Sequence, residues 1–180
     1  GNAVVRDREH PDKLETEDTQ NLSNLDTKFD TGWYPSPHSD IVALMVLEHQ
    51  AYMTNLITRV GYETRMALHS QAAINSALGQ PADEMSESTK RRINSAVEEL
   101  VQYMLFVDEA PLTHRVEGTS EFAKVFAASG PLREFDLTRR IFKYPCSYLI
   151  YSEAFDNMPA GAKDRTYPRL WEVLSGADKT

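Results

Sequence analysis

Residues 39–78 of the chain read SDIVALMVLEHQAYMTNLITRVGYETRMALHSQAAINSAL, and this stretch decides the fold. It begins with an uninterrupted apolar run, IVALMVL, at positions 41–47. Apolar residues then recur three and four positions apart from Met53 to Val60. Such spacing places them on one side of an α-helix. The stretch therefore predicts a single long helix that buries one side in a core.

Both ends of this helix carry recognisable signals. Ser39 is a good N-cap residue, and Asp40 suits the positive end of the helix dipole. Gly79 and Pro81 form a stop signal at the other end. Because roughly forty residues is long for a helix in a globular protein, Gly61 predicts a kink or a break within it.

Five further segments have the spacing or the flanking signals of helices. They are residues 86–108, 120–129, 136–142 and 147–157, and a last helix that Pro159 opens, Pro168 kinks and Gly176 ends. The sequence has no alternating pattern of useful length that is typical of strands. We therefore expect an all-α fold, a helical bundle of about five to six helices.

Residues 1–38 differ in kind from the rest of the chain. They carry eight acidic against four basic residues, and they have few large apolar residues and no helical or strand period. We predict a long, irregular, extended acidic arm over residues 1–38 and a helical bundle domain over residues 39–180. The residues expected to pin the arm on the bundle are Leu22, Leu25, Phe29, Trp33 and Tyr34.

The charge balance narrows the class of partner. The chain has 27 acidic and 19 basic residues and a net charge of −8. We therefore expect neither nucleic acid nor an anionic membrane surface as the main partner. The longest apolar run has seven residues, whereas a membrane-spanning helix needs roughly 20. We expect no membrane span, and no signal peptide is recognisable.

The chain has one cysteine, Cys146. Because a disulfide and a CxxCH haem-attachment site each need two cysteines, this chain can form neither by itself. A thiol at the start of a helix can act as a nucleophile, but no matching arrangement of histidine and aspartate accompanies this one. Packing in the core is the better interpretation of Cys146.

Glu48 and His49 directly follow the apolar run, in what should be the driest part of the long helix. An unpaired buried charge costs several kcal/mol or shifts its pKa by up to about 3–5 units. Both side chains therefore need partners. We predict that a ligand or metal site of the bundle lies near them.

Two neighbouring stripes run along this helix. His49 shares the apolar stripe with Met53 and Leu56, at the spacing of side chains that are neighbours on one helix. The other stripe is a polar ladder of carboxylate, phenol, amide and guanidinium side chains. The candidate ligand- or partner-binding residues are Glu48, His49, Tyr52, Asn55, Arg59, Tyr62, Glu63 and Arg65.

Other interpretations of this helix stay open. Metal sites in bundles use Glu-x-x-His motifs, which the chain lacks, and Glu48 and His49 point about 100° apart, so we predict no metal ligands. In an architectural role, Glu48 pairs with Arg59, Arg65 or a base of another helix, and His49 hydrogen-bonds a backbone carbonyl. His49 or Met53 is also a candidate axial ligand of a haem, but not both, because they share one face.

Six segments together carry a family resemblance. They are PHSDIVALMVLEHQ at 37–50, NLITR at 55–59, YETR at 62–65, LFVDEA at 105–110, FKYPCSYLIYSEAF at 142–155 and RLWEVLSG at 169–176. With them, the chain resembles the C-terminal portion of a family of exported bacterial proteins related to c-type cytochromes. The resemblance covers nearly the whole chain.

The resemblance implies a periplasmic setting and a link to haem electron transfer. Fuller members of that family carry a CxxCH segment upstream, which implies that haem c sits on a portion of the parent protein outside this chain. The expected function is a helical module that packs against that haem-bearing portion or a redox partner. The alternatives are a metal- or ligand-binding bundle that uses the Glu48/His49 stripe, with enzyme activity undecided, and a plain interaction scaffold.

Overall fold

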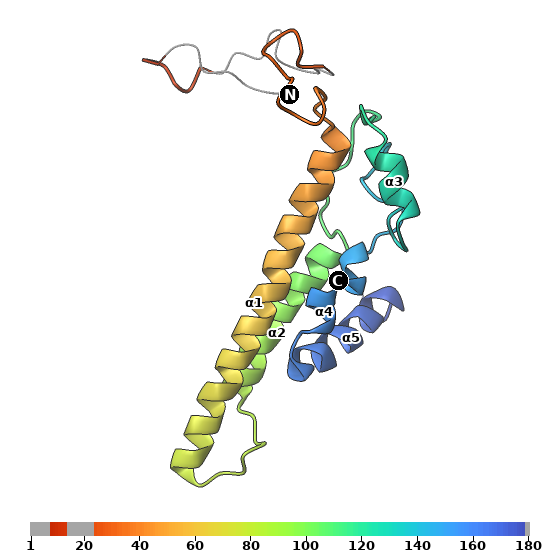
Figure 1. Cartoon of the computed structure of the whole chain (residues 1–180). Helices are drawn as coiled ribbons and strands as arrows, with labels where there is room; N and C mark the ends of the chain where they lie inside the picture. The colour runs from red at the N-terminus through yellow and green to blue at the C-terminus, as the bar shows by residue number, and fades with distance from the viewer. Residues whose placement is uncertain (1–7, 14–23, 179–180) are drawn as a thin grey trace.

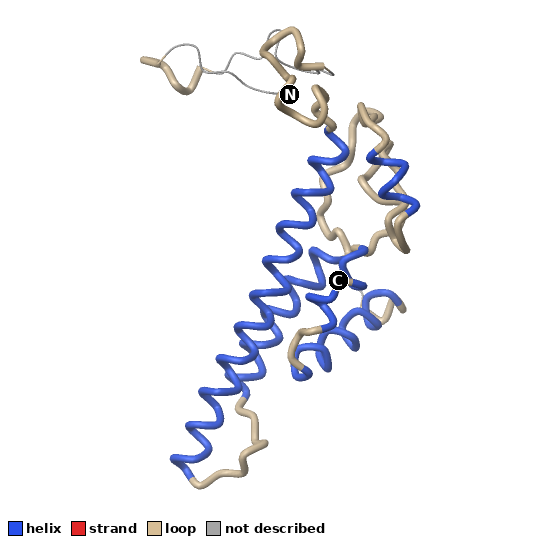
Figure 2. The backbone as a smooth tube through the Cα atoms, in the orientation of Figure 1, coloured by secondary structure: helices blue, strands red, loops and turns tan. Residues whose placement is uncertain are grey.

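The computed structural model describes residues 8–13 and 24–178, and this part of the chain is all-α, as predicted (Figure 1, Figure 2). Its elements are α1 (Ile41–Leu78), α2 (Glu87–Met104), α3 (Phe122–Ala128), the 3₁₀-helix η1 (Tyr148–Tyr151), α4 (Glu153–Asp156) and α5 (Ala160–Leu174). Within the described residues no strand forms, and one isolated antiparallel bridge joins Phe135 to Phe142. None of these helices is both long and apolar enough to cross a bilayer.

The N-cap of α1 is Asp40 rather than the predicted Ser39, so the helix begins at Ile41. The Asp40 carboxylate accepts hydrogen bonds from the backbone N–H groups of Val42 and Ala43, at 2.9 and 3.2 Å. It also accepts from the backbone N–H and the hydroxyl of Ser120. One carboxylate therefore caps α1 and ties the segment before α3 to it.

The two glycines at and near the end of α1 have different roles. Gly79 ends the helix in the left-handed conformation, with φ at 66°, as predicted. The predicted break at Gly61 is wrong, since α1 is one continuous helix. A Cβ at Gly61 would lie 3.2 Å from a guanidinium nitrogen of Arg65 and 3.8 Å from Cδ of Pro159, the residue before α5. The start of α5 therefore lies next to Gly61, at a distance that would give a Cβ there an ordinary van der Waals contact.

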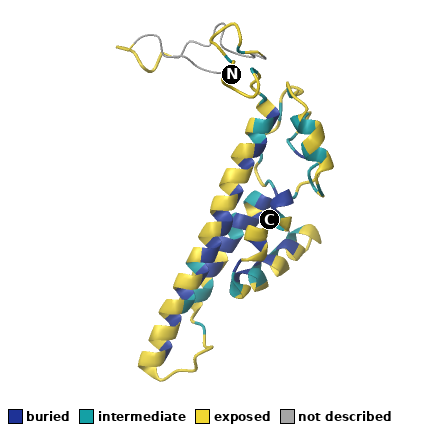
Figure 3. Ribbon diagram, viewed as in Figure 1, coloured by how far each residue is buried: buried dark blue, intermediate teal, exposed yellow. Residues whose placement is uncertain are grey.

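The core lies where α1, α2 and α5 pack against one another (Figure 1). Figure 3 shows the buried residues of α1 as a stripe that faces α2. The main contributors are Val46, Met53, Leu56 and Val60 of α1, Ile93, Val97, Leu100 and Met104 of α2, and Ala162 and Leu170 of α5. The predicted spacing of three and four residues on α1 and α2 is confirmed.

A buried polar network closes the turn between α1 and α2. The Asn75 amide donates to the backbone carbonyls of Pro81 and Glu84, at 2.9 and 2.8 Å, and accepts from the Gln71 amide at 2.7 Å. The Gln71 carbonyl oxygen accepts from the backbone N–H and the hydroxyl of Ser86, the N-cap of α2. Two buried side chains of α1 therefore satisfy the loop that reverses the chain.

We expect Asn75→Ala to lower the free energy of unfolding by about 2 kcal/mol, because it removes the side-chain donor to the carbonyl of Glu84 and the acceptor of the buried Gln71 amide. Urea unfolding measures the change. Asn55→Ala is the matched control, since Asn55 lies exposed on the same helix, and it should change stability by less than about 0.5 kcal/mol. Equal effects of the two substitutions would contradict the role of the network.

α2 ends at Met104, four residues before the predicted end at Asp108. Phe106 and Asp108 adopt left-handed φ values of 56° and 58°. Such values are uncommon for residues other than glycine, and they turn the chain out of the helix. The turn places Phe106 beside α1, where it takes part in the candidate site.

Residues 136–142, predicted as a helical segment, form a turn instead. The Asp136 carboxylate accepts hydrogen bonds from the backbone N–H groups of Thr138 and Arg139, both at 3.0 Å. Side chain to backbone bonds of this kind compete with helix formation. The isolated bridge described above then closes the turn.

The predicted helix over residues 147–157 consists of two short helices. Ser147 caps η1 and Ser152 caps α4, each through its side-chain oxygen. Pro159 occupies the N-cap position of α5, one residue before the predicted place, and Pro168 lies inside that helix. Two serine caps in close succession thus split one apolar segment into two elements.

The aromatic residues of the arm do not pin it on the bundle, contrary to the prediction. Trp33 is 89% exposed, and Phe29 packs edge-on against Tyr34 with 5.8 Å between ring centroids. Phe29 and Tyr34 therefore contact each other, and Leu25 is half-buried. Leu22, also predicted to pin the arm, lies outside the described residues.

Candidate functional site

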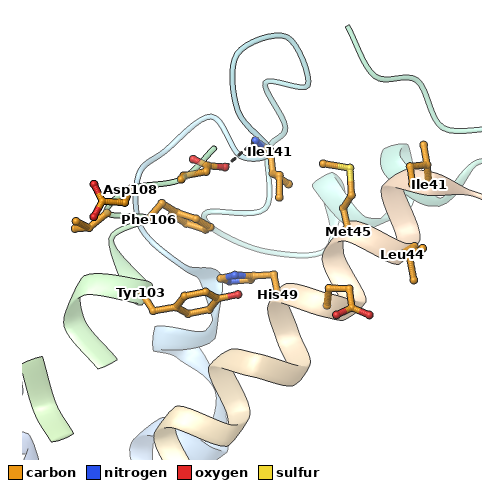
Figure 4. A pocket seen from close by; sticks show the side chains of 11 residues that line it. Ile41, Leu44, Met45, His49, Tyr103, Phe106, Asp108 and Ile141 are labelled. Carbon is orange, nitrogen blue, oxygen red and sulfur yellow. Dashed lines mark hydrogen bonds between the residues drawn. The ribbon is translucent and has the colours of Figure 1, made fainter. Parts of the chain in front are cut away.

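A pocket of about 580 Å³ lies beside the beginning of α1 (Figure 4). Its apolar lining residues are Ile41, Leu44 and Met45 of α1, Tyr103 of α2, and Phe106, Val107 and Ile141 of the loops that follow. Its polar lining residues are Glu48, His49, Asp108 and Glu109. The pocket opens to solvent, because Ile41, Leu44 and Val107 are exposed.

His49 is the buried polar group of this lining. Its ring stacks on Tyr103 and on Phe106, with centroid separations of 5.3 and 4.9 Å, and Figure 4 shows it between them. Its Nε2 lies 2.8 Å from Oγ of Ser147, which is 98 positions away in the sequence. The predicted burial of His49 is confirmed, whereas its partner is a side-chain hydroxyl rather than the expected backbone carbonyl.

His49, Tyr103 and Phe106 form an aromatic wall of the pocket, and this wall is uncharged near neutral pH. Burial lowers the pKa of His49 from 6.5 to about 4, so its imidazole is neutral. Burial also raises the pKa of Tyr103, and the charges of Tyr52 and Glu48 add to this rise. Tyr52 packs edge-on against Tyr103, with 4.6 Å between ring centroids.

The segment that carries Ser147 is fixed to the end of α2. The Ser147 N–H donates to the carbonyl of Met104 at 2.8 Å. Its Oγ accepts from the N–H of Leu149 at 3.3 Å, as the cap of η1. Since Ser147 is fully buried, His49 has a partner whose position is set by the backbone.

Phe142 is buried next to this wall and joins several elements. Its ring contacts those of His49, Phe106, Phe126, Phe135 and Tyr148, with centroid separations from 5.4 to 6.3 Å. Aromatic pairs add about 0.5–1.5 kcal/mol beyond the burial of their area. Phe142 therefore links α1, α3 and η1 in one aromatic cluster.

Glu109 positions Ile141 in the lining. Its Oε2 accepts from Nε and Nη2 of Arg140, at 3.1 and 2.8 Å. Its Oε1 accepts from the backbone N–H of Ile141 at 3.2 Å, the dashed line of Figure 4. The Arg140 guanidinium also lies 5.7 Å from the centroid of the Phe106 ring. This carboxylate thus connects the loop after α2 to the loop before η1.

Glu48 lines the pocket, but it is exposed, so the prediction that this acid is sequestered is wrong. A helix has 3.6 residues per turn, so only part of a seven-residue apolar run can face the core. Val42 and Val46 are buried, whereas Leu47 is exposed. Glu48 therefore needs no buried partner, and the Arg59 expected to pair with it binds elsewhere.

The rest of the polar ladder does not reach the pocket. Those residues are Tyr52, Asn55, Arg59, Tyr62, Glu63 and Arg65, none of which is part of the lining. Two of them contact α2: Nη1 of Arg59 lies 2.7 Å from Glu99, and Glu63 lies 2.5 Å from Nε of Arg92. Exposed ion pairs contribute only about 0–1 kcal/mol. A binding role for the ladder stays a prediction.

Both candidate axial ligands of a haem iron make other contacts. His49 has its Nε2 on Ser147 and an aromatic ring on each face, and Met53 is fully buried in the core. Across residues 8–13 and 24–178, no three His, Cys, Asp or Glu side chains form a cluster. Cys146 is half-buried, and burial raises the pKa of its thiol, which disfavours a nucleophilic thiolate.

The comparisons with known proteins assign no family. No protein-family model matches the chain, and neither a curated protein nor a solved structure does. The pocket and the sequence resemblance are therefore the two supports for a function.

Proposed function

We propose that this chain is a helical module of an exported bacterial protein related to c-type cytochromes, placed in the periplasm. In this proposal, the pocket packs against the haem-bearing segment of the same parent protein. The six segments that carry the resemblance support the setting and the link to electron transfer. The open apolar pocket is the single observation that supports the contact.

The lining has the chemistry that such a contact needs. Haem c is a flat and mostly apolar ring, and the pocket offers aliphatic side chains of α1 beside the ring of Phe106. Apolar surface gains about 25 cal/mol per Å² when it leaves water. An exposed apolar hollow is typical of an interaction site. The neutral imidazole of His49 adds no charge to this surface.

The role proposed for this chain is packing rather than iron ligation. Haem c, held upstream, would supply the electron transfer. Leu44 and Met45 would exclude water from the ring edge, because their side chains line the pocket. His49 would keep the aromatic wall in place through its bond to Ser147.

Leu44→Glu is expected to weaken binding of a haem peptide, a short CxxCH peptide that carries haem c, by about tenfold or more. A carboxylate buried in an apolar contact costs several kcal/mol, while the half-exposed Leu44 is not needed for the fold. The purified chain is titrated with the peptide, and the Soret absorbance and the tryptophan fluorescence are recorded.

Ile74→Glu is the matched control for this experiment. Leu44 is 49% exposed and Ile74 is 51% exposed on the same helix, but Ile74 lies outside the pocket lining. This variant should bind the haem peptide like the unchanged chain. A Soret band that does not respond to the unchanged chain, or equal weakening by both variants, contradicts the proposed function.

A second candidate function is a small-molecule-binding bundle. The pocket volume of about 580 Å³ falls within the range of about 300–1,000 Å³ that is usual for ligand sites. Glu48 and His49 both belong to its lining, as the alternative interpretation of the sequence requires. In that case a small apolar probe binds and the haem peptide does not; a plain scaffold would bind neither.

A further inference from the structure

A second hollow adjoins the pocket and differs from it in charge. It has a volume of about 440 Å³ and shares Phe106, Asp108 and Glu109 with the pocket. Its other lining residues are Pro111, Arg139, Arg140 and Lys143. The pocket lining contains no arginine or lysine. The two hollows thus meet at shared residues, one apolar and the other with three cations.

Two of these cations retain hydrogen-bond donors for a ligand. Arg139 holds Asp136 through Nε and Nη2, at 3.3 and 3.1 Å, and its side chain is 84% exposed. Lys143 holds Glu134 at 2.6 Å, and half of its side chain is exposed. A guanidinium has five N–H groups and an ammonium has three. Each side chain therefore has donors beyond those that its intramolecular pair uses.

The carboxylates of the hollow leave room for an anion. Glu109 is neutralised by Arg140, and it also accepts from the backbone N–H of Ile141. Asp108 is exposed and lines both hollows, so it opposes an anionic ligand. Arg139 and Lys143 are each paired with a carboxylate outside the lining, Asp136 and Glu134, but both side chains face solvent and keep N–H groups for a ligand.

We propose that the two hollows together bind a small organic anion with an apolar body. The apolar part lies in the pocket, and the acid group, a carboxylate or sulfonate, lies at Arg139 and Lys143. The inference rests on the pocket of the proposed function and names the class of group that the pocket accepts. The apolar lining of the pocket disfavours a charge, whereas hydrogen bonds from an arginine to an anion are strong. The pocket therefore selects the apolar body of the ligand, and the second hollow selects its acid group.

Two fluorescent probes that differ in charge test this inference on the full chain. Anilinonaphthalene sulfonate is the anion, and N-phenylnaphthylamine is its uncharged counterpart. Leu44→Glu should abolish binding of both probes and Ile74→Glu should spare both, which places the probes in the pocket. Arg139→Gln combined with Lys143→Gln should weaken the sulfonate probe by about tenfold and leave the uncharged probe unchanged.

Arg115→Gln is the control for the loss of positive charge. Arg115 is exposed and paired with Glu117, like the two cations above, but it lines neither hollow. Asp108→Asn should tighten binding of the sulfonate probe by about threefold, since it removes the opposing charge. Equal weakening of both probes by the double variant, or no change for either, overturns the inference.

Failure of this inference and failure of the proposed function are distinguishable. Suppose that Arg139→Gln combined with Lys143→Gln does not weaken the sulfonate probe, while the haem peptide still binds. The pocket then accepts uncharged groups, and the inference is wrong. If the sulfonate probe binds through Arg139 and Lys143 while the haem peptide does not bind, the inference stands. In that case the hollows are a small-molecule site, and the cytochrome-linked function is wrong.

Discussion

Phe142→Ala is expected to lower the free energy of unfolding by about 3–5 kcal/mol. The side chain is 1% exposed and contacts five other rings. Its truncation leaves a cavity among groups that come from α1, α3 and η1. The pocket should be lost too, since Ile141 precedes this residue directly. Urea unfolding of the two proteins measures the difference.

Tyr144→Ala and Phe142→Leu are the controls for this result. Tyr144 lies two residues further and is partly exposed, so its truncation should cost less than about 1 kcal/mol. Phe142→Leu keeps most of the apolar volume and should cost about 1–2 kcal/mol. A similar loss for Phe142→Ala and Tyr144→Ala would show that the aromatic cluster does not hold the pocket together.

Lowering the pH from 7 to 4 is expected to cost the folded state about 3 kcal/mol through His49 alone. Burial lowers its pKa from 6.5 to about 4. Between these values the unfolded chain binds a proton that the folded chain does not. The contribution of His49 is therefore fully present above pH 6.5 and is lost as the pH falls towards 4.

His49→Gln should remove this part of the pH dependence, although it also lowers stability at pH 7. His114→Gln replaces an exposed histidine and should leave the loss of stability that His49 causes in place. An NMR titration of the ring protons of His49 measures its pKa directly. A value near 6.5 in the folded protein, or parallel stability curves for His49→Gln and the unchanged chain, would contradict the prediction.

The helical fold could be predicted because its signals are local. The apolar spacing of α1 and α2 lies within each helix, and Gly79 and Ser86 cap them within one residue of the expected ends. Two predictions failed because the residue on which each depended is compatible with more than one local structure. Gly61 reads as a break, but α5 packs against it. Residues 136–142 read as a helical segment, but the carboxylate of Asp136 closes a turn there.

The end of α2 could not be predicted from its own residues. The apolar pattern continues past Met104, and helix propensity gives no reason for Phe106 and Asp108 to adopt left-handed conformations. The tertiary contacts of Phe106 supply the reason. Its ring leaves the helix axis and stacks on His49, which belongs to another helix. A contact of this kind has no signature in the segment itself.

Only part of the candidate site could be predicted from the sequence. His49 lies on the apolar stripe, so its burial could be predicted, and the same reasoning failed for Glu48 because the apolar run is wider than the face of α1 that packs. Tyr103, Ile141 and Ser147 were missed. They come from segments that meet α1 only in the folded chain, and the resemblance marked the segment of Ser147 without giving it a role.

The two ends of α1 are joined to the rest of the protein over very different lengths of chain. Asn75 bonds a carbonyl nine residues away, whereas His49 bonds a hydroxyl 98 residues away. Each doubling of a loop costs about 0.6 kcal/mol more to close, so short-range contacts form first. We therefore expect the α1–α2 hairpin to form first and the pocket around His49 to assemble on it afterwards. A force on the chain around Ser147 would therefore separate Ser147 from His49 and disrupt the pocket, while the α1–α2 hairpin stays folded.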